Sequence, residues 1–297
     1  MLLPPGTRVV LRVAIAGARS AYPVGAVATI VQAPADRTHA YRIRLADGFE
    51  ASASRDELVR LADAKQPIPI SPLDDRELRS SVAYVCVVGS RAYGLDHADS
   101  DWDRRGFYLP DAERHWSLFG VPEQLEDDAR QECFWEVQKF CVLAAKANPN
   151  VLECLWTPLV EFAAPIAQDL LAMRTAFLSR LVYQTYNGYA LSQFAKLQQR
   201  ARRGEQPRPK HMMHLVRLLR AGIVILREGR VPVHVGEALP ELLAIRDGAM
   251  AWPDLDALRR RLHAEFDDSY AATRLPERPD HAAIDAWLIR ARRSMVR

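Results

Sequence analysis

The residues best suited to chemistry lie in one stretch, VCVVGSRAYGLDHADSDWDRRGFYLP, at residues 85–110. An apolar run ends there in Gly89 and Ser90, and two carboxylates one residue apart, Asp101 and Asp103, open the next run. Because strand side chains alternate, both carboxylates would point to the same face of a strand. Two neighbouring anions repel each other, so the pair indicates a divalent cation between them. Carboxylate oxygens suit Mg²⁺ or Mn²⁺.

The Gly-Ser pair indicates a second ligand. Because Gly89 has no Cβ, backbone N–H groups at this turn can approach an anion closely, and a helix starting at Arg91 would add its N-terminus. A metal site beside a phosphate cradle predicts phosphoryl or nucleotidyl transfer with two metal ions. Either motif alone is common. Their combination is specific: strand, Gly-Ser, ten residues, then Asp-x-Asp in a second strand.

Three segments must position these residues. Gly and Pro turns divide residues 1–65 into short strands, which predicts a small β-barrel. Residues 66–160 alternate helix and strand, and residues 161–297 show helical periodicity. The predicted strands are 8–14, 27–32, 41–45, 49–53, 82–88, 102–109 and 130–135. The predicted helices are one of about ten residues that opens at Ser71 and Pro72, and those at 137–144, 178–203, 209–227, 254–273 and 280–295.

Composition and charge set the class of protein. The chain has 297 residues and a net charge of +3. Residues 66–160 carry nine Lys and Arg against sixteen Asp and Glu, whereas residues 161–297 carry twenty-two against fifteen. An acidic middle beside basic ends fits a cation site between surfaces that bind a polyanion. No apolar run is long enough for a membrane span, no signal peptide is evident and the four cysteines lack metal spacing, so we expect a cytoplasmic protein without membrane partners.

The string GSRAYGLDHADSDWDRRGFYLP resembles the DNA-polymerase-β-like nucleotidyltransferase superfamily. Within it, the string resembles the branch of predicted nucleotidyltransferases associated with RNA repair and RNA ligases. Two later strings, EVQKFCVLAAKANPNVLECLW and KHMMHLVRLLRAGIVILREGRV, resemble the same branch, so the likeness covers roughly residues 73–235. The N-terminal strings PPGTRVVL and YPVGAVATIV resemble SH3-like, KOW-type barrels. These likenesses imply an α/β (α+β) nucleotidyltransferase core with a small mixed sheet, an SH3-like barrel before it and a helical domain after it.

The resemblance also implies a set of catalytic residues. Gly89 and Ser90 would hold the triphosphate, and Asp101 and Asp103 would ligate both metal ions. The superfamily needs a third carboxylate on a neighbouring strand, and we expect Glu132 to supply it, as a catalytic residue and a metal ligand. Asp127 and Asp128 are alternatives, and another register would place Gln131 there. Without a third acid the fold could bind a nucleotide with little catalysis.

Further nucleotide-binding residues are expected on two helices. Arg91 and Tyr93 follow the phosphate turn, although Arg91 could instead pair with Asp96 or Asp99. Lys210, His214 and Arg217 share one side of the helix at 209–227 and match the branch's Lys-His…His…Arg string, where they could form a cationic clamp on pyrophosphate. Basic residues at 196 and 200–203 could contact RNA phosphates.

The leading hypothesis is a metal-dependent nucleotidyltransferase that moves NMP from an NTP, with ATP expected, to an acceptor hydroxyl and releases pyrophosphate. The branch's association implies an RNA or tRNA 3′ end as acceptor. One alternative is a protein-AMPylating enzyme, similar to small antitoxins, which would use a protein acceptor. Others are transfer to a small molecule and a non-catalytic module that binds a nucleotide or RNA.

Overall fold

The computed structural model describes residues 3–16, 21–34, 40–61, 75–98, 100–194 and 209–296. The chain divides into two compact units, Met1–Pro72 and Leu73–Arg297. Each unit has a hydrophobic core of its own. The stretch at 196 and 200–203, expected to contact RNA, lies outside the described residues, as does Asp99.

The smaller unit is a five-stranded antiparallel sheet with strand order β6-β5-β4-β1-β7. In β5, Tyr41, Ile43 and Leu45 are buried while the residues between them are exposed, as expected for a sheet with one solvent-exposed face. The predicted closed, SH3-like barrel is not confirmed, because β6 and β7 lie at open edges in the described residues. The elements are β1 (Arg8–Leu11), β2 (Ile15–Ala16), β3 (Ala21–Tyr22), β4 (Val27–Gln32), β5 (Tyr41–Leu45), β6 (Glu50–Ala53), η1 (Arg55–Glu57) and β7 (Leu58–Arg60).

The larger unit contains a mixed five-stranded sheet with order β10-β11-β9-β8-β12. β11 runs parallel to β9, and the other neighbours are antiparallel. The mixed sheet predicted for the core is therefore present. Its strands are β8 (Val82–Val88), β9 (Asp103–Tyr108), β10 (Gln124–Asp127), β11 (Glu132–Glu136) and β12 (Val160–Ala163). The sequence analysis predicted β8, β9 and β11, but neither edge strand.

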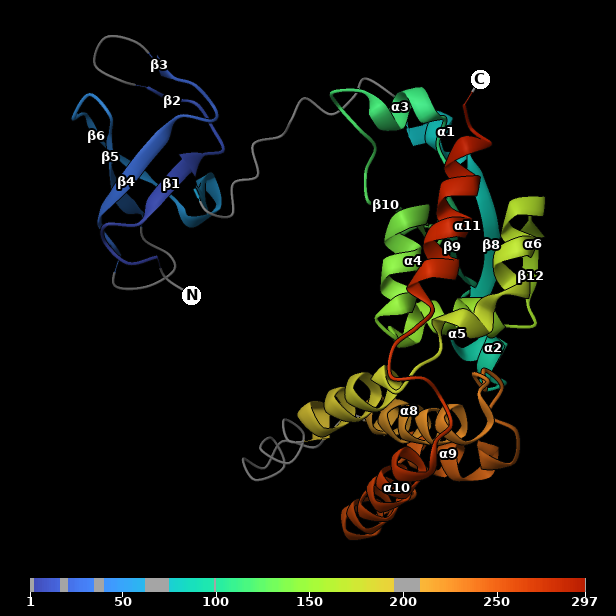
Figure 1. The fold of residues 1–297 in the computed structure, drawn as a ribbon. Helices are drawn as coiled ribbons and strands as arrows, with labels where there is room; N and C mark the ends of the chain where they lie inside the picture. Colours follow the sequence, from blue (N-terminus) through green and yellow to red (C-terminus); the bar gives the residue numbers. More distant parts are fainter. Residues whose placement is uncertain are drawn as a thin grey trace. The chain divides into compact units, whose positions relative to one another are not determined.

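Helices cover one face of this sheet (Figure 1). α4 (Val137–Ala145) packs on β9 and β11, and α5 (Pro149–Trp156) packs on β8. α11 (His281–Arg293) lies along α4 and places Trp287 edge-on against Phe107, with ring centroids 6.2 Å apart. The sequence analysis placed this C-terminal helix in the helical segment at residues 161–297. In the structure it also packs on the sheet. A smaller apolar cluster, containing Leu78, Tyr108 and Phe134, covers the other face.

The remaining helices extend the same core. α8 (Pro209–Glu228) is amphipathic and packs against both α9 (Leu239–Arg246) and α10 (Trp252–Ala272). Residues 181–194 are helical, with a π-helical turn, η3 (Tyr183–Asn187), that contacts α8. The other elements are α1 (Asp75–Arg79), α2 (Ser90–Tyr93), α3 (Ala112–Trp116), α6 (Pro165–Ala172), η2 (Arg174–Phe177) and η4 (Gly236–Ala238).

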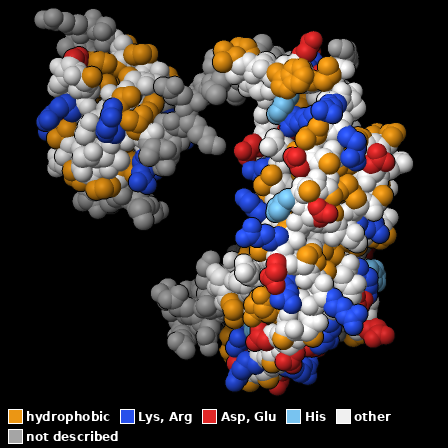
Figure 2. Space-filling view, in the orientation of Figure 1, with side chains coloured by type: hydrophobic (Ala, Val, Ile, Leu, Met, Phe, Trp, Pro, Cys, Tyr) orange, Lys and Arg blue, Asp and Glu red, His pale blue; other side chains and the backbone are white. Residues whose placement is uncertain are grey.

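Surface charge in the larger unit is mixed. Figure 2 shows Lys and Arg interspersed with Asp and Glu over the visible face. The acidic and basic segments of the sequence are therefore not separated into large single-sign fields on that face. None of the described helices has both the length and the apolar character needed to cross a membrane.

Candidate active site

The turn after β8 and the start of β9 lie side by side. β8 and β9 are antiparallel, and their register pairs Val88 with Asp103. Gly89 and Ser90, which follow Val88, therefore lie next to the carboxylates. All four predicted residues, Gly89, Ser90, Asp101 and Asp103, line one cavity of about 480 Å³, which we name cavity 1.

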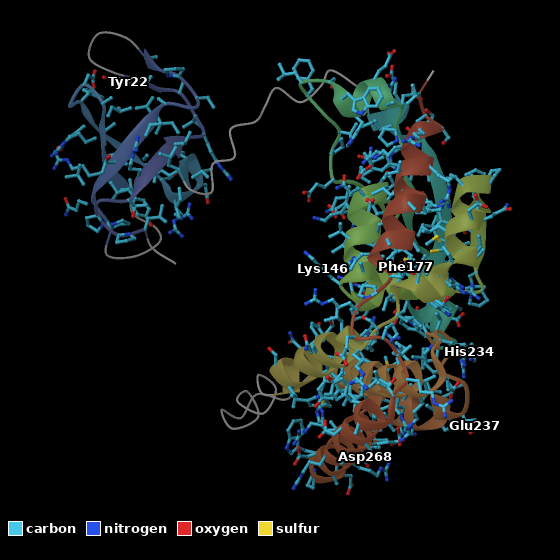
Figure 3. The ribbon with its side chains drawn as sticks, viewed as in Figure 1. Tyr22, Lys146, Phe177, His234, Glu237 and Asp268 are labelled. Atoms are coloured by element: carbon cyan, nitrogen blue, oxygen red, sulfur yellow. The ribbon has the colours of Figure 1, made fainter. Side chains whose placement is uncertain are left out.

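The backbone of Gly89 requires a glycine. Its φ is +74°, and a Cβ built on it would lie 2.5 Å from Oδ2 of Asp103. A side chain at this position would therefore both strain the backbone and displace the carboxylate. The short helix α2 begins at Ser90 and ends at Gly94, which also has a positive φ of +73°. A Cβ on Gly94 would lie 2.4 Å from Nε2 of His234, which is labelled in Figure 3.

Replacing Gly89 by alanine should reduce the nucleotidyl transfer expected from the sequence by about a hundredfold, because a displacement of about 1 Å at a reacting group costs this much. The matched control is Gly120→Ala. Gly120 also has a positive φ, of +59°, but has no atom within 4 Å of a built Cβ. Gly120→Ala should lose about 1–2 kcal/mol of stability from its positive φ alone. Gly89→Ala should lose more, because Gly89 combines φ +74° with ψ −155°, a conformation that only glycine adopts readily, and its Cβ would also meet Asp103. Equal activity in the two variants would show that the close approach of Gly89 to Asp103 has no role.

Arg91 holds the loop that leads to the carboxylates. Its Nε donates to the carbonyl of Ser100 at 3.1 Å, and its Nη1 lies 3.7 Å from Asp96. The guanidinium also stacks over Trp102, 4.3 Å from the ring centroid. This is the alternative pairing considered for Arg91. These contacts already engage the Arg91 side chain in holding the loop. The predicted binding of a phosphate by Arg91 therefore stays a prediction.

Glu132 is not brought together with Asp101 and Asp103. In the parallel register it pairs with Arg104, so it shares the face of Arg104, and Cys133 occupies the Asp103 side. Its carboxylate accepts a hydrogen bond from Nη1 of Arg79 at 2.7 Å. Glu132 and Phe134 share one face of β11, as the sequence predicted. That face is opposite to the one on which Asp103 lies. Among the described residues no three His, Cys, Asp or Glu side chains form a metal-binding group.

Glu132→Gln should therefore leave the turnover number within about threefold of wild type, as expected for a substitution away from the reacting groups. Steady-state kinetics would check this, with Asp103→Asn as the positive control. A loss of a hundredfold or more would restore Glu132 as the third catalytic acid and would require a strand register different from the one described.

A buried ion pair ties three elements together behind cavity 1. Glu153 of α5 is 1% exposed and accepts hydrogen bonds from Oη of Tyr93 and from Nη1 of Arg217, both at 2.6 Å. The guanidinium of Arg217 lies 3.7 Å from the centroid of the Tyr93 ring. Burial and the Glu153 carboxylate raise the pKa of the Tyr93 phenol, which therefore remains a donor. Burial alone would lower the pKa of Arg217, but the Glu153 carboxylate raises it overall.

The predicted cationic clamp is only partly present in cavity 1. Lys210 and His214 line the cavity, whereas Arg217 is neutralised by Glu153. Burial, with the charges of Arg217 and Lys210, lowers the pKa of His214 to about 4, so its imidazole is neutral near pH 7. Arg246 of α9 also lines cavity 1. It donates to the carbonyl of Leu95 at 3.0 Å and pairs with the exposed carboxylate of Asp247 at 3.1 Å. The sequence analysis missed Arg246 and Glu153, which no local motif marks.

The donor set fits a hard divalent cation. Asp101 and Asp103 both face cavity 1, and Asp103 has one weak cationic neighbour, Nη2 of Arg105 at 3.5 Å. The carboxylate oxygens thus remain available to a ligand in the cavity, and Mg²⁺ or Mn²⁺ prefers such oxygens together with substrate phosphates. The site holds two of the three carboxylates that were expected.

Comparisons with known proteins agree with this geometry. The sequence model of RlaP, described as the RNA repair pathway DNA polymerase beta family, matches residues 54–290. Among curated proteins, the chain is similar to the uncharacterized protein YcgL of Bacillus subtilis (strain 168), with 34% identity over 98 residues. That match covers 32% of this chain and 38% of YcgL, so it spans well under half of the relative. No solved structure matches the chain.

Proposed function

Because the chain belongs to the RNA repair pathway DNA polymerase beta family, we propose that it transfers NMP from an NTP to the 3′ hydroxyl of an RNA and releases pyrophosphate. ATP is the proposed donor. The observation that carries the proposal is the convergence of the Gly89–Ser90 turn with Asp101 and Asp103 in one cavity. The β8–β9 register holds this arrangement, and it supports polyphosphate binding beside a carboxylate-bound metal ion.

Each part of cavity 1 would have a distinct role. Asp101 and Asp103 would hold one or two Mg²⁺ or Mn²⁺ ions, which when bound neutralise phosphate charge and lower the pKa of the attacking hydroxyl. Gly89 and Ser90 would hold the β- and γ-phosphates through the backbone N–H groups of the turn. Lys210 and Arg246 supply positive charge for the pyrophosphate, which leaves when the acceptor oxygen attacks the α-phosphorus in line.

The lowered pKa of His214 favours a neutral imidazole at neutral pH, so we assign it no fixed positive charge. Its imidazole can instead donate or accept a hydrogen bond at the wall of cavity 1. The positive charge available to the pyrophosphate is therefore assigned to Lys210 and Arg246. Glu153 is a positioning residue, because its carboxylate binds both Tyr93 of α2 and Arg217 of α8 and so holds these two helices together.

A labelling experiment tests the proposal. The protein is incubated with each α-³²P-labelled NTP, Mg²⁺ and either total RNA or RNA-free cell lysate. We expect label in RNA, no label when the RNA has first been oxidised with periodate to destroy its terminal diol, and no label with the Asp101→Asn/Asp103→Asn variant. Label in polypeptide would replace the RNA acceptor by a protein. The absence of label from both fractions with all four NTPs would contradict the enzyme proposal.

A further inference from the structure

A second cavity adjoins cavity 1. It has a volume of about 450 Å³, and we name it cavity 2. It lies between the start of α5, the helical residues 181–194 and α8. Lys146, labelled in Figure 3, marks this end of α4, because Thr185 in the cavity wall donates to the Lys146 carbonyl at 3.2 Å. Cavities 1 and 2 have Tyr93 and His214 in common, so a ligand in one contacts the wall of the other.

The two cavities differ in chemistry. Cavity 1 is lined by carboxylates, Lys210 and Arg246, which suit metal ions and phosphates. Of the described residues that line cavity 2, none is Asp or Glu. Its walls combine apolar groups, an aromatic ring that is half-exposed and two side-chain amides. The apolar groups are Leu215 and Leu218, the aromatic ring is that of Tyr189, and the amides are those of Asn148 and Asn150.

Arg217 gives cavity 2 a buried polar group with unused capacity. The residue is 8% exposed, lines the cavity and is fixed by Glu153, yet its Nε has no hydrogen-bond partner among the described residues. Buried donors without partners are rare in folded proteins. Arg217 also lies over the Tyr93 ring, and Glu153 accepts hydrogen bonds from both side chains, so these contacts hold the wall between the two cavities in place. A site pre-organised in this way is suited to a ligand that carries acceptors.

We propose that cavity 2 binds a nucleoside. A nucleobase has a flat face that can stack on the Tyr189 ring and an edge of donors and acceptors that can pair with the Asn150 amide. Asn148 can add its amide N–H groups as donors, because its Oδ1 already accepts from the backbone of Asn150 and Val151 at the start of α5. A cavity of about 450 Å³ is also within the usual range for small-molecule sites. The inference rests on the proposed function, because the nucleoside would belong either to the NTP donor or to the terminal nucleotide of the acceptor RNA.

Ligand-observed NMR with adenosine, guanosine, cytidine and uridine tests this directly, since these probes carry no phosphate. At least one should bind, and Tyr189→Ala should weaken its binding by about tenfold, the scale of losing one base-stacking contact. Asn150→Ala should weaken it as well. The control Trp116→Ala removes an aromatic residue that is 67% exposed on α3, and it should leave the affinity unchanged.

A second probe separates this inference from the proposed function. Tripolyphosphate with Mg²⁺ should bind to wild type and to Tyr189→Ala equally, and should lose affinity in Asp101→Asn/Asp103→Asn. Suppose that tripolyphosphate gives these results but no ribonucleoside binds. Cavity 2 is then not a nucleoside site. The same conclusion holds if a ribonucleoside binds with unchanged affinity to Tyr189→Ala and Asn150→Ala. Binding of N-acetyl-tyrosine amide in place of the nucleosides would also overturn the inference and would favour a protein acceptor.

The two sources of the nucleoside give opposite competition results. If the donor base occupies cavity 2, a single NTP spans both cavities and must displace the bound ribonucleoside. If the acceptor end occupies it, ribonucleoside and NTP must bind together, and the NTP should leave the nucleoside affinity unchanged or raise it. Both results support a nucleoside site, and they assign it to different substrates.

Discussion

Asp101→Asn/Asp103→Asn should reduce nucleotidyl transfer by about a thousandfold or more, because metal-assisted charge stabilisation at the reacting phosphate is the largest contribution available in this site. The fold should survive the change. Asp101 is exposed, and among the described residues the Asp103 carboxylate makes one ion pair, with Arg105 at 3.5 Å. Removing two neighbouring anions therefore eliminates a repulsion at little cost in ion pairing. Label transfer and thermal unfolding of the same preparations would measure both quantities.

The control for this pair is Asp268→Asn, which removes an exposed carboxylate from α10 (Figure 3). It should retain wild-type transfer and stability. If the double variant keeps transfer within about tenfold of this control, the carboxylates are not metal ligands in the reaction. If it unfolds while Asp268→Asn does not, their role is structural, which also contradicts the account.

Glu153→Gln should destabilise the larger unit by about 3–5 kcal/mol, because it leaves the buried guanidinium of Arg217 without its counter-charge. The pair is almost fully buried, with side-chain exposures of 10% for Arg217 and 2% for Glu153. The substituted glutamine would keep one acceptor oxygen for the two donors, so either Tyr93 or Arg217 would lose its hydrogen-bond acceptor. Urea denaturation followed by circular dichroism would give the change in the free energy of unfolding.

An ion pair between α8 and α9 provides the matched control. Arg220 and Glu241 are 2.6 Å apart but are 34% and 27% exposed, so Glu241→Gln should cost about 1 kcal/mol or less. Replacing both buried partners, as in Glu153→Gln/Arg217→Met, should recover part of the lost stability, because the unpaired charge is then absent. Equal costs for Glu153→Gln and Glu241→Gln would contradict the structural role of the buried pair.

The parts of the site that are contiguous in sequence were predictable. β8, the Gly89–Ser90 turn and β9 form one antiparallel unit. Strand alternation predicted Asp101 and Asp103 on one face of a strand. β9 begins only at Asp103, so Asp101 precedes the strand, but both residues line cavity 1. The long amphipathic helix α8 was likewise evident from its periodicity, because an apolar stripe repeats along all of it. In both cases the signal lies within a short window of the chain.

The parts that depend on long-range pairing were not predictable. The face of Glu132 follows from the parallel register of β11 against β9, which no local pattern specifies. Arg217 was predicted as part of a cationic clamp, because no local pattern indicates its pairing with Glu153, 64 residues away. Similarly, α11 packs on the sheet through Trp287, although its sequence pattern is that of any amphipathic helix.

The central claim is that the Gly89–Ser90 turn and the two carboxylates bind one metal–polyphosphate ligand. The most direct measurement is anomalous diffraction from crystals of the protein soaked with Mn²⁺ and a non-hydrolysable ATP analogue. The account predicts an anomalous peak within ligand distance, about 2.0–2.3 Å, of the carboxylate oxygens of Asp101 and Asp103, with the analogue's phosphates against Gly89. A manganese ion elsewhere, or Asp101 and Asp103 turned apart and paired with arginines in the presence of both ligands, would contradict it.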